Sequence, residues 1–326
     1  MSDLKAIVES LSKKGLEASF LSDDSSPCVV SEFLSTGCYI LDSIMGGGLP
    51  LGRMVEIYGG TSTGKSLIAA QACAVVQEDN GTAVYIDTET AVSLPIMKAV
   101  GVQVDKLIYS APDTVEQVFE AMETAIDLKG DVPMLIVWDS IAATSAEAEM
   151  EKDFGETGYL THARVISQAL RKLARKVSRT KTSLLFLNQA KTNIGVMYGD
   201  KIATFGGKAV GFHASIRVML SKDTTVKNKD KRTVGICVEA KVTKNKIAPP
   251  FRTATLPIYF GHGVDDAEAS LLFLKDSDDI SFANGIYTSK RMELKFRKAE
   301  WAGLYDKQYD KVCDAIDAII ADLDIM

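Results

Sequence analysis

The sequence predicts an α/β fold with a mostly parallel central sheet flanked by helices. Two observations lead to this prediction. Short apolar strands that end in polar residues alternate with helical periodicities: we expect strands at 53–58, 82–87, 134–139 and 183–187, and helices at 66–77, 114–128 and 161–181. Further strands are expected at 215–220, 235–242 and 253–259, with turns at 223–232 and 248–250, which is typical of an antiparallel extension of the sheet.

The composition is that of a globular protein, with 326 residues, 46% hydrophobic and 25% charged. We find no apolar run near the roughly 18 residues that cross a bilayer, so we expect a cytoplasmic protein with no membrane partner. The 5 cysteines form no C-x-x-C pair, and we expect reduced thiols that serve packing rather than a zinc site.

Three parts are expected along the chain. Residues 1–34 hold an amphipathic helix and a linker-like run, and the periodicity leaves open whether this helix folds back on its own core or packs on a neighbouring molecule. Residues 35–260 form the α/β core. Residues 261–326 carry a net charge of -6, with mixed strand and helix patterns, and we expect a small C-terminal α+β domain there.

Residues 59–66 fit the phosphate-loop pattern G-x-x-x-x-G-K-[ST] without a mismatch. In such a loop, backbone N–H groups curl around the phosphates, Lys65 reaches the β- and γ-phosphates, and the Ser66 hydroxyl can ligate Mg²⁺. The alternative is a Gly-rich turn without a ligand, but the strand before it and the helix after it favour a nucleoside triphosphate site. The residues expected to bind the nucleotide are Gly59, Gly60, Thr61, Ser62, Thr63, Gly64, Lys65, Ser66 and Leu67.

Two carboxylates follow buried strands of the predicted sheet. Asp139 closes the strand at 134–139, and Glu89 comes just after the strand at 82–87. Ligands of open parallel sheets bind at the carboxyl ends of strands, so both acids are expected near the phosphate loop. A strand that merely ends in an acid is common; paired with the loop, Asp139 is expected to bind the nucleotide and to hold Mg²⁺ together with Ser66.

A strongly basic segment lies inside this acidic protein. Residues 161–217 hold eleven lysines and arginines against one acid, Asp200. They comprise a basic amphipathic helix and a Gly-rich loop around 191–207, and this asymmetry has the sign expected of a face that binds a polyanion. The alternative for any single charge is a solvated outer face.

These motifs, in this order, resemble those of the RecA family, the bacterial and phage strand-exchange recombinases, over nearly the whole chain. The resemblance rests on Ser35-Thr-Gly, Gly46-Gly-Gly-Leu-Pro-Leu-Gly-Arg53, the phosphate loop, Tyr85-Ile-Asp-Thr-Glu89, Ser167-Gln-Ala-Leu-Arg-Lys-Leu173, Asn188-Gln189, Ile194-Gly-Val-Met-Tyr-Gly199 and Lys244-Asn-Lys-Ile-Ala248. It implies a RecA-like P-loop ATPase core and a DNA-dependent ATPase that uses ATP and Mg²⁺.

The resemblance also implies roles for individual residues. Glu89 is similar to the carboxylate that activates the attacking water, and Gln189 to the γ-phosphate sensor. Lys244 and Lys246 resemble the pair that reaches the neighbouring subunit's γ-phosphate. A helical filament of identical subunits on single-stranded DNA, which pairs with double-stranded DNA, is therefore implied, with the N-terminal helix as the oligomerisation arm.

The expected DNA-binding residues come from the two segments that resemble the family's DNA-binding loops and from the basic helix. They are Arg164, Ser167, Arg171, Asn193, Ile194, Gly195, Val196, Met197, Gly206 and Gly207. Where the family stacks a tyrosine on adenine, this chain has Ile96, so other residues could contact the base. A ring-forming helicase on the same core, or an ATPase that acts only as a nucleotide switch, are the alternative functions.

Overall fold

The computed structural model describes residues 2–16, 18–20, 29–150, 159–192 and 202–325. Its helices are α1 (Ser2–Lys13), α2 (Tyr39–Met45), α3 (Lys65–Glu78), α4 (Leu94–Ala99), α5 (Val115–Leu128), α6 (Glu147–Met150), α7 (Tyr159–Val177), α8 (Lys208–His213), α9 (Asp266–Asp276), α10 (Trp301–Lys307) and α11 (Tyr309–Ile325), with 3-10 turns at Ile141–Ala143 and Lys298–Glu300. Within these residues, no helix combines the length and the apolar character that crossing a bilayer requires.

The strands form a large central sheet and two small ones. They are β1 (Phe33–Leu34), β2 (Leu49–Pro50), β3 (Met54–Gly59), β4 (Thr82–Asp87), β5 (Ile108–Ser110), β6 (Met134–Asp139), β7 (Thr182–Thr192), β8 (Ile202–Thr204), β9 (Ile216–Lys227), β10 (Thr233–Asn245), β11 (Thr253–Tyr259), β12 (Gly263–Val264), β13 (Ile280–Ala283), β14 (Ile286–Ser289) and β15 (Leu294–Phe296).

The central sheet has the order β12-β11-β10-β9-β3-β7-β6-β4-β5, and β8 pairs with β7. Strands β9, β3, β7, β6, β4 and β5 run parallel to one another, whereas β10, β11 and β12 add antiparallel pairs. The predicted α/β class with an antiparallel extension is thereby confirmed.

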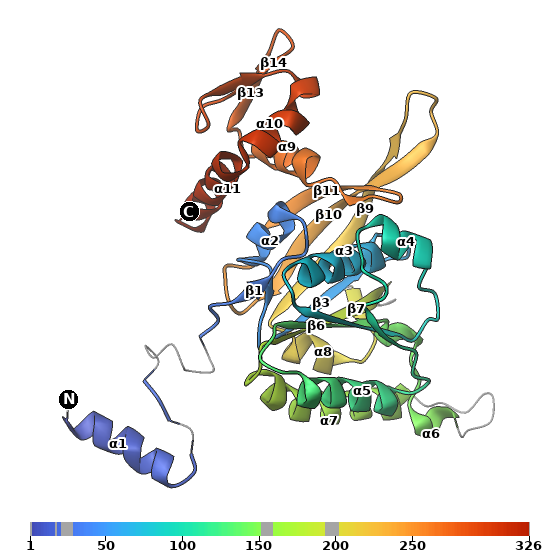
Figure 1. Ribbon diagram of the computed structural model, residues 1–326, viewed down its shortest axis with the longest axis vertical. Coiled ribbons are helices and arrows are strands. Elements are labelled where there is room, and N and C mark those ends of the chain that lie inside the picture. Colours follow the sequence, from blue (N-terminus) through green and yellow to red (C-terminus); the bar gives the residue numbers. More distant parts are fainter. Residues whose placement is uncertain (1, 17, 21–28, 151–158, 193–201, 326) are drawn as a thin grey trace.

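Helices cover both faces of this sheet. In Figure 1, α3 and α4 lie on one face, and α5 and α7 lie on the other. Alternate residues of each strand point to opposite faces. In β6, Leu135 and Val137 therefore join the apolar cluster under α3, whereas Ile136 and Trp138 join the cluster under α5 and α7.

The C-terminal segment packs on the core through the α3-side cluster. That cluster continues from Leu256 of β11 into Leu271 of α9 and Ile316 of α11. β13, β14 and β15 form a separate antiparallel sheet, visible at the top of Figure 1. Because β12 lies beyond residue 261 and still pairs with β11, the boundary between residues 260 and 261 stays a prediction.

A run of aromatic contacts connects this small sheet to α2. Each ring lies within 4.6–6.2 Å of the next, centroid to centroid. The rings in order are Phe282, Tyr287, Phe296, Trp301, Tyr305, Tyr309 and Tyr39.

The hairpin of β9 and β10 differs from the expectation. The turn expected at 223–232 is shorter, because β9 continues to Lys227 and β10 begins at Thr233. Oδ1 of Asn228 accepts from the backbone N–H groups of Asp230 (3.0 Å) and Arg232 (2.9 Å), and these bonds hold a tight turn.

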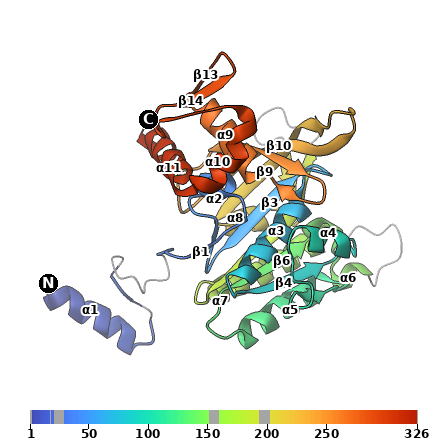
Figure 2. The same ribbon diagram turned by 45° about the horizontal axis from the view of Figure 1, so that its top comes forward.

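The expected N-terminal helix is α1, which lies apart from the remaining elements in Figures 1 and 2.

A close backbone approach fixes the strand end that leads to the phosphate loop. Gly59 of β3 lies opposite Leu220 of β9, and a Cβ atom at Gly59 would lie 2.2 Å from the carbonyl oxygen of Leu220. Such a contact is far inside van der Waals distance, so only glycine fits between the two strands.

We therefore expect Gly59→Ala to destabilise the protein by about 1–3 kcal/mol, the usual cost of overpacking. The matched control is Gly60→Ala, where the nearest atom to a new Cβ is Thr63 Cγ2 at 4.0 Å. Urea unfolding of both variants measures the effect. Equal stability of the two variants would contradict the close approach.

Candidate functional site

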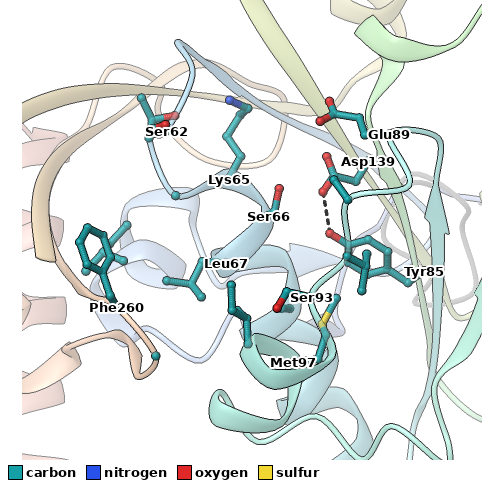
Figure 3. Close-up of a pocket in the computed structure, with 18 of the residues that line it drawn as sticks. Ser62, Lys65, Ser66, Leu67, Tyr85, Glu89, Ser93, Met97, Asp139 and Phe260 are labelled. Atoms are coloured by element: carbon teal, nitrogen blue, oxygen red, sulfur yellow. Dashed lines mark hydrogen bonds between the residues drawn. The ribbon is translucent and has the colours of Figure 1, made fainter. Parts of the chain in front are cut away.

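The parallel strands bring the predicted nucleotide site together at one edge of the sheet. In the ladder, Asp87 lies opposite Asp139, and Gly59 lies opposite Gln189. A cavity of about 450 Å³ opens at this edge (Figure 3). Its lining includes Ser62, Thr63, Gly64, Lys65, Ser66, Leu67, Tyr85, Glu89, Ser93, Ile96, Met97, Asp139, Ile236, Ile258, Phe260 and Gly261.

The phosphate loop ends where α3 begins, at Lys65. Gly64 has a φ of +85°, a left-handed conformation that glycine adopts without strain, and a Cβ there would lie 2.5 Å from Ile258 Cδ1. Nζ of Lys65 donates to the carbonyl oxygen of Gly60 at 2.7 Å, within its own loop. The N-terminus of α3 and this ammonium together make a site for an anion.

Asp139 faces Ser66 and the inner wall of the cavity. Tyr85 on β4 donates its hydroxyl to Oδ2 of Asp139 at 2.7 Å, the dashed line in Figure 3. Burial raises the pKa of the Asp139 carboxyl, whereas the Ser66 and Tyr85 hydroxyls lower it. Burial lowers the pKa of Lys65, and Asp139 and Glu89 raise it. A hydroxyl beside a carboxylate is an oxygen donor set of the kind that Mg²⁺ prefers.

Glu89 reaches the cavity from the segment that follows β4. Ser140 donates its hydroxyl to Oε1 of Glu89 at 2.5 Å, and Thr88 and Ser140 hold the two strand ends together through bonds of 2.9 and 3.1 Å. Glu89 itself is exposed at the rim. Its carboxylate is thus oriented by one hydroxyl and remains open to solvent.

The opposite end of the cavity is apolar. Ile96 and Met97 of α4 lie on one side, and Phe260 with Gly261, after β11, also line it. Ile96 is 46% exposed and Phe260 is 56% exposed, so both have surface left for a flat ligand. No role was predicted for Phe260, and Tyr85 was named only as the first residue of the motif that ends at Glu89. An aromatic residue directly after a buried strand, followed by glycine, was the available signal for Phe260.

Three predicted catalytic residues do not line this cavity among the described residues: Gln189, Lys244 and Lys246. Gln189 lies one strand away, beside Gly59. Nζ of Lys244 donates to the carbonyl oxygens of Gly211 (2.7 Å) and Phe212 (2.9 Å), and Nζ of Lys246 donates to that of Phe212 (3.1 Å). Burial, followed by the charge of Lys246, lowers the pKa of Lys244 to about 8.

Some of the predicted DNA-binding residues lie together on and beside α7. Arg164, Ser167 and Arg171 follow an i, i+3, i+7 spacing on α7, and they therefore share one face of that helix. Gly206 packs on the same helix, since a Cβ there would lie 3.3 Å from Ile166 Cδ1. Gly207 follows it and is exposed. Asn193, Ile194, Gly195, Val196 and Met197 lie outside the described residues.

Part of the basic segment is neutralised by acids from elsewhere in the chain. Lys172 and Lys176 of α7 pair with acids of α5, and Lys181 and Arg217 pair with Glu32 and Glu56. Arg164 and Arg171 are exposed, on the face that carries Ser167. The charge asymmetry of the sequence is therefore partly neutralised, and Arg164 and Arg171 keep exposed positive charges on α7.

We expect the apolar end of the cavity to hold the base. Ile96→Tyr should tighten ATP binding about two- to tenfold, because aromatic stacking contributes about 0.5–1.5 kcal/mol. Phe260→Ala should weaken it about tenfold, since loss of a stacking partner costs about 1–3 kcal/mol. Calorimetric titration with ATP measures both. The control is Phe282→Ala, which removes a phenylalanine that is 61% exposed outside the cavity. If neither cavity variant differs from that control, the base binds elsewhere.

Comparison with known proteins gives a consistent result. The model of the RecA N-terminal domain matches residues 3–265. The chain is 38% identical to Protein RecA of Lactococcus lactis subsp. cremoris (strain MG1363) over 288 residues, 87% of this chain and 74% of the relative. It is 37% identical to Protein RecA of Methylococcus capsulatus over 290 residues, 89% of this chain and 82% of the relative.

A third relative, Protein RecA of Gluconacetobacter polyoxogenes, is 44% identical over 234 residues, 72% of this chain and 66% of the relative. The match of the family model covers the phosphate loop, both cavity carboxylates and the strands that position them. The resemblance in the motifs is thereby confirmed, and the chain belongs to the RecA family.

Proposed function

We propose that this protein is an ATP-dependent DNA recombinase that forms filaments on single-stranded DNA, pairs that strand with duplex DNA and hydrolyses ATP at subunit interfaces. The observation that carries the proposal is one cavity that gathers Lys65, Ser66, Asp139 and Glu89 in a member of the RecA family.

Each residue of the cavity has a distinct role in this proposal. The loop N–H groups and Lys65 bind the β- and γ-phosphates. Ser66 and Asp139 hold a Mg²⁺ ion, which would neutralise charge on the phosphate oxygens. Glu89 orients the attacking water, because its carboxylate is at the rim and is fixed by Ser140. Gln189, which lies beside Gly59 in the neighbouring strand β7, senses the γ-phosphate.

Self-association is supported by two unpaired apolar surfaces on one chain. Leu4, Ile7 and Leu11 of α1 are 57%, 56% and 37% exposed. At the open edge of the sheet, a cavity of about 810 Å³ is lined by Ile108 of β5 and by residues of α5. A patch that binds a different patch on the next copy generates a head-to-tail polymer. Residues 1–34 would then be the oligomerisation arm.

We infer that Lys244 and Lys246 act in the neighbouring subunit's site. They lie outside the described lining of their own cavity, and they are held at the C-terminal end of α8. In the filament, they would supply positive charge to the γ-phosphate of the adjacent subunit. Single-stranded DNA would bind along the face of α7 that carries Arg164, Ser167 and Arg171, with Gly206, Gly207 and residues 193–197 beside it.

Strand exchange between circular single-stranded and linear duplex DNA tests the function. The wild-type protein should catalyse it with ATP. Lys65→Ala should lose ATP binding, whereas Glu89→Gln should retain ATP and DNA binding but lose turnover by about 10²–10⁴-fold. Unchanged ATP binding by Lys65→Ala in calorimetry would contradict the site, and near-normal turnover of Glu89→Gln would assign the water to another base.

Subunit mixing tests the trans role of the lysines. Lys246→Ala and Glu89→Gln proteins should each be inactive, but mixed filaments should recover DNA-dependent hydrolysis. Recovery is expected because, where the two variants meet in one orientation, a single interface holds an intact Glu89 and an intact Lys246. No recovery at any ratio, with mixed filaments verified by labelled subunits, would place both residues in one subunit's site.

A further inference from the structure

Glu56 is a carboxylate buried in the middle of β3, on the strand that leads into the phosphate loop. Its side chain is completely buried. Nε of Arg217 on β9 donates to Oε2, and Nδ2 of Asn188 on β7 donates to Oε1 at 2.9 Å. A buried carboxylate without partners is strongly unfavourable, so both neighbours are needed to hold this charge inside the sheet.

Asn188 extends the contact to the chain on both sides of residues 193–201. Its Nδ2 also donates to the carbonyl oxygen of Phe205 at 2.9 Å. Its Oδ1 accepts from the backbone N–H of Gln189 at 2.9 Å and from that of Phe205 at 3.2 Å. One amide therefore fixes the backbone of β7 at Gln189 and the backbone that follows β8.

Arg217 extends the contact in the other direction. Its Nη2 donates to Oγ1 of Thr204 on β8 at 3.3 Å, and its guanidinium lies over the ring of Tyr58, 4.6 Å from the centroid. In the sheet, Arg217 lies opposite Glu56 on one side and opposite Lys244 on the other.

Glu56, Asn188 and Arg217 thus connect the strands that carry the nucleotide-binding and DNA-binding residues of the proposed function. The strand of the phosphate loop (β3), the strand of Gln189 (β7), β8 and β9 are joined around one buried charge, and Arg217 of β9 lies opposite Lys244 of β10. Because both carboxylate oxygens of Glu56 and both polar atoms of the Asn188 side chain have defined partners, a displacement of one strand breaks bonds at the others.

We propose that Glu56 is a positioning residue that couples nucleotide binding in the cavity to DNA binding at Gly206 and Gly207, which follow β8 and Phe205. This inference rests on the proposed function and adds how its two ligands communicate. Glu56 contacts neither ligand. It acts by holding Asn188 and Arg217 in the one arrangement that joins the strand ends.

The test measures coupling rather than activity. In the wild-type protein, a non-hydrolysable ATP analogue should tighten binding of an oligothymidylate by a factor in the range of about 5–150, and DNA should tighten analogue binding by the same factor. Glu56→Gln keeps the shape but removes the charge. We expect each ligand alone to bind within about twofold of wild type, and both coupling factors to fall together at least about fivefold.

The matched control is Asp279→Asn. Asp279 is also a buried carboxylate, with Ser289 and Arg291 as partners, but it lies in the C-terminal segment away from these strands. If the role of Glu56 were only structural, both variants would lose stability and active fraction while the coupling factor of the folded protein stayed at the wild-type value. That result would overturn the inference.

A milder variant covers the case in which Glu56→Gln fails to fold. Thr204→Val removes only the bond from Arg217 to β8 and leaves the pair with Glu56 in place. We expect a smaller loss of coupling with unchanged stability, and a wild-type coupling factor would contradict the inference. A wild-type protein whose two ligands bind independently would instead contradict the proposed function.

Discussion

The parallel pairing of β3 between β7 and β9 is the constraint on which the site depends. A parallel ladder brings the carboxyl ends of neighbouring strands to the same edge. The register sets which residues meet there: Gly59 with Gln189 on one side, and Gly59 with Leu220 on the other. The glycine requirement at residue 59 follows from the second pair, and the proximity of the loop to the β7 end follows from the first. A slip of one residue would turn every side chain of β3 to the opposite face.

Burial shifts the pKa values of the acidic and basic groups of the site in opposite directions, and neighbouring groups oppose these shifts. The same loss of water that raises the pKa of Asp139 lowers the pKa of Lys65. The hydroxyls of Ser66 and Tyr85 lower the pKa of Asp139, and the charges of Asp139 and Glu89 raise the pKa of Lys65. For Lys244, burial and the charges of Lys246 and Arg217 lower the pKa, and among the causes only the charge of Glu56 raises it.

Local patterns in the sequence predicted the fold more completely than the contacts of the site. The strands at 82–87, 134–139 and 253–259 have the expected bounds, because an apolar run bounded by polar residues carries its own limits. The β9–β10 turn differed because one asparagine side chain shortens it. The phosphate loop was predicted from its residue spacing, and the two carboxylates from their positions directly after buried strands. The Glu56–Arg217 pair was not, because it joins residues 161 positions apart and a lone acid inside an apolar strand gives no sign of its partner.

The aromatic run from the small sheet to α2 also means that intrinsic tryptophan fluorescence can report on this part of the fold. The chain has 2 tryptophans, and they belong to different apolar clusters. Trp301 lies inside the run of tyrosine and phenylalanine rings, and its indole N–H donates to the carbonyl oxygen of Ala267. Trp138 is fully buried between Phe119 and Phe186 on the other face of the sheet. Single-tryptophan variants would therefore separate the fluorescence of the C-terminal junction from that of the sheet interior, and each spectrum would record the loss of one cluster without the other.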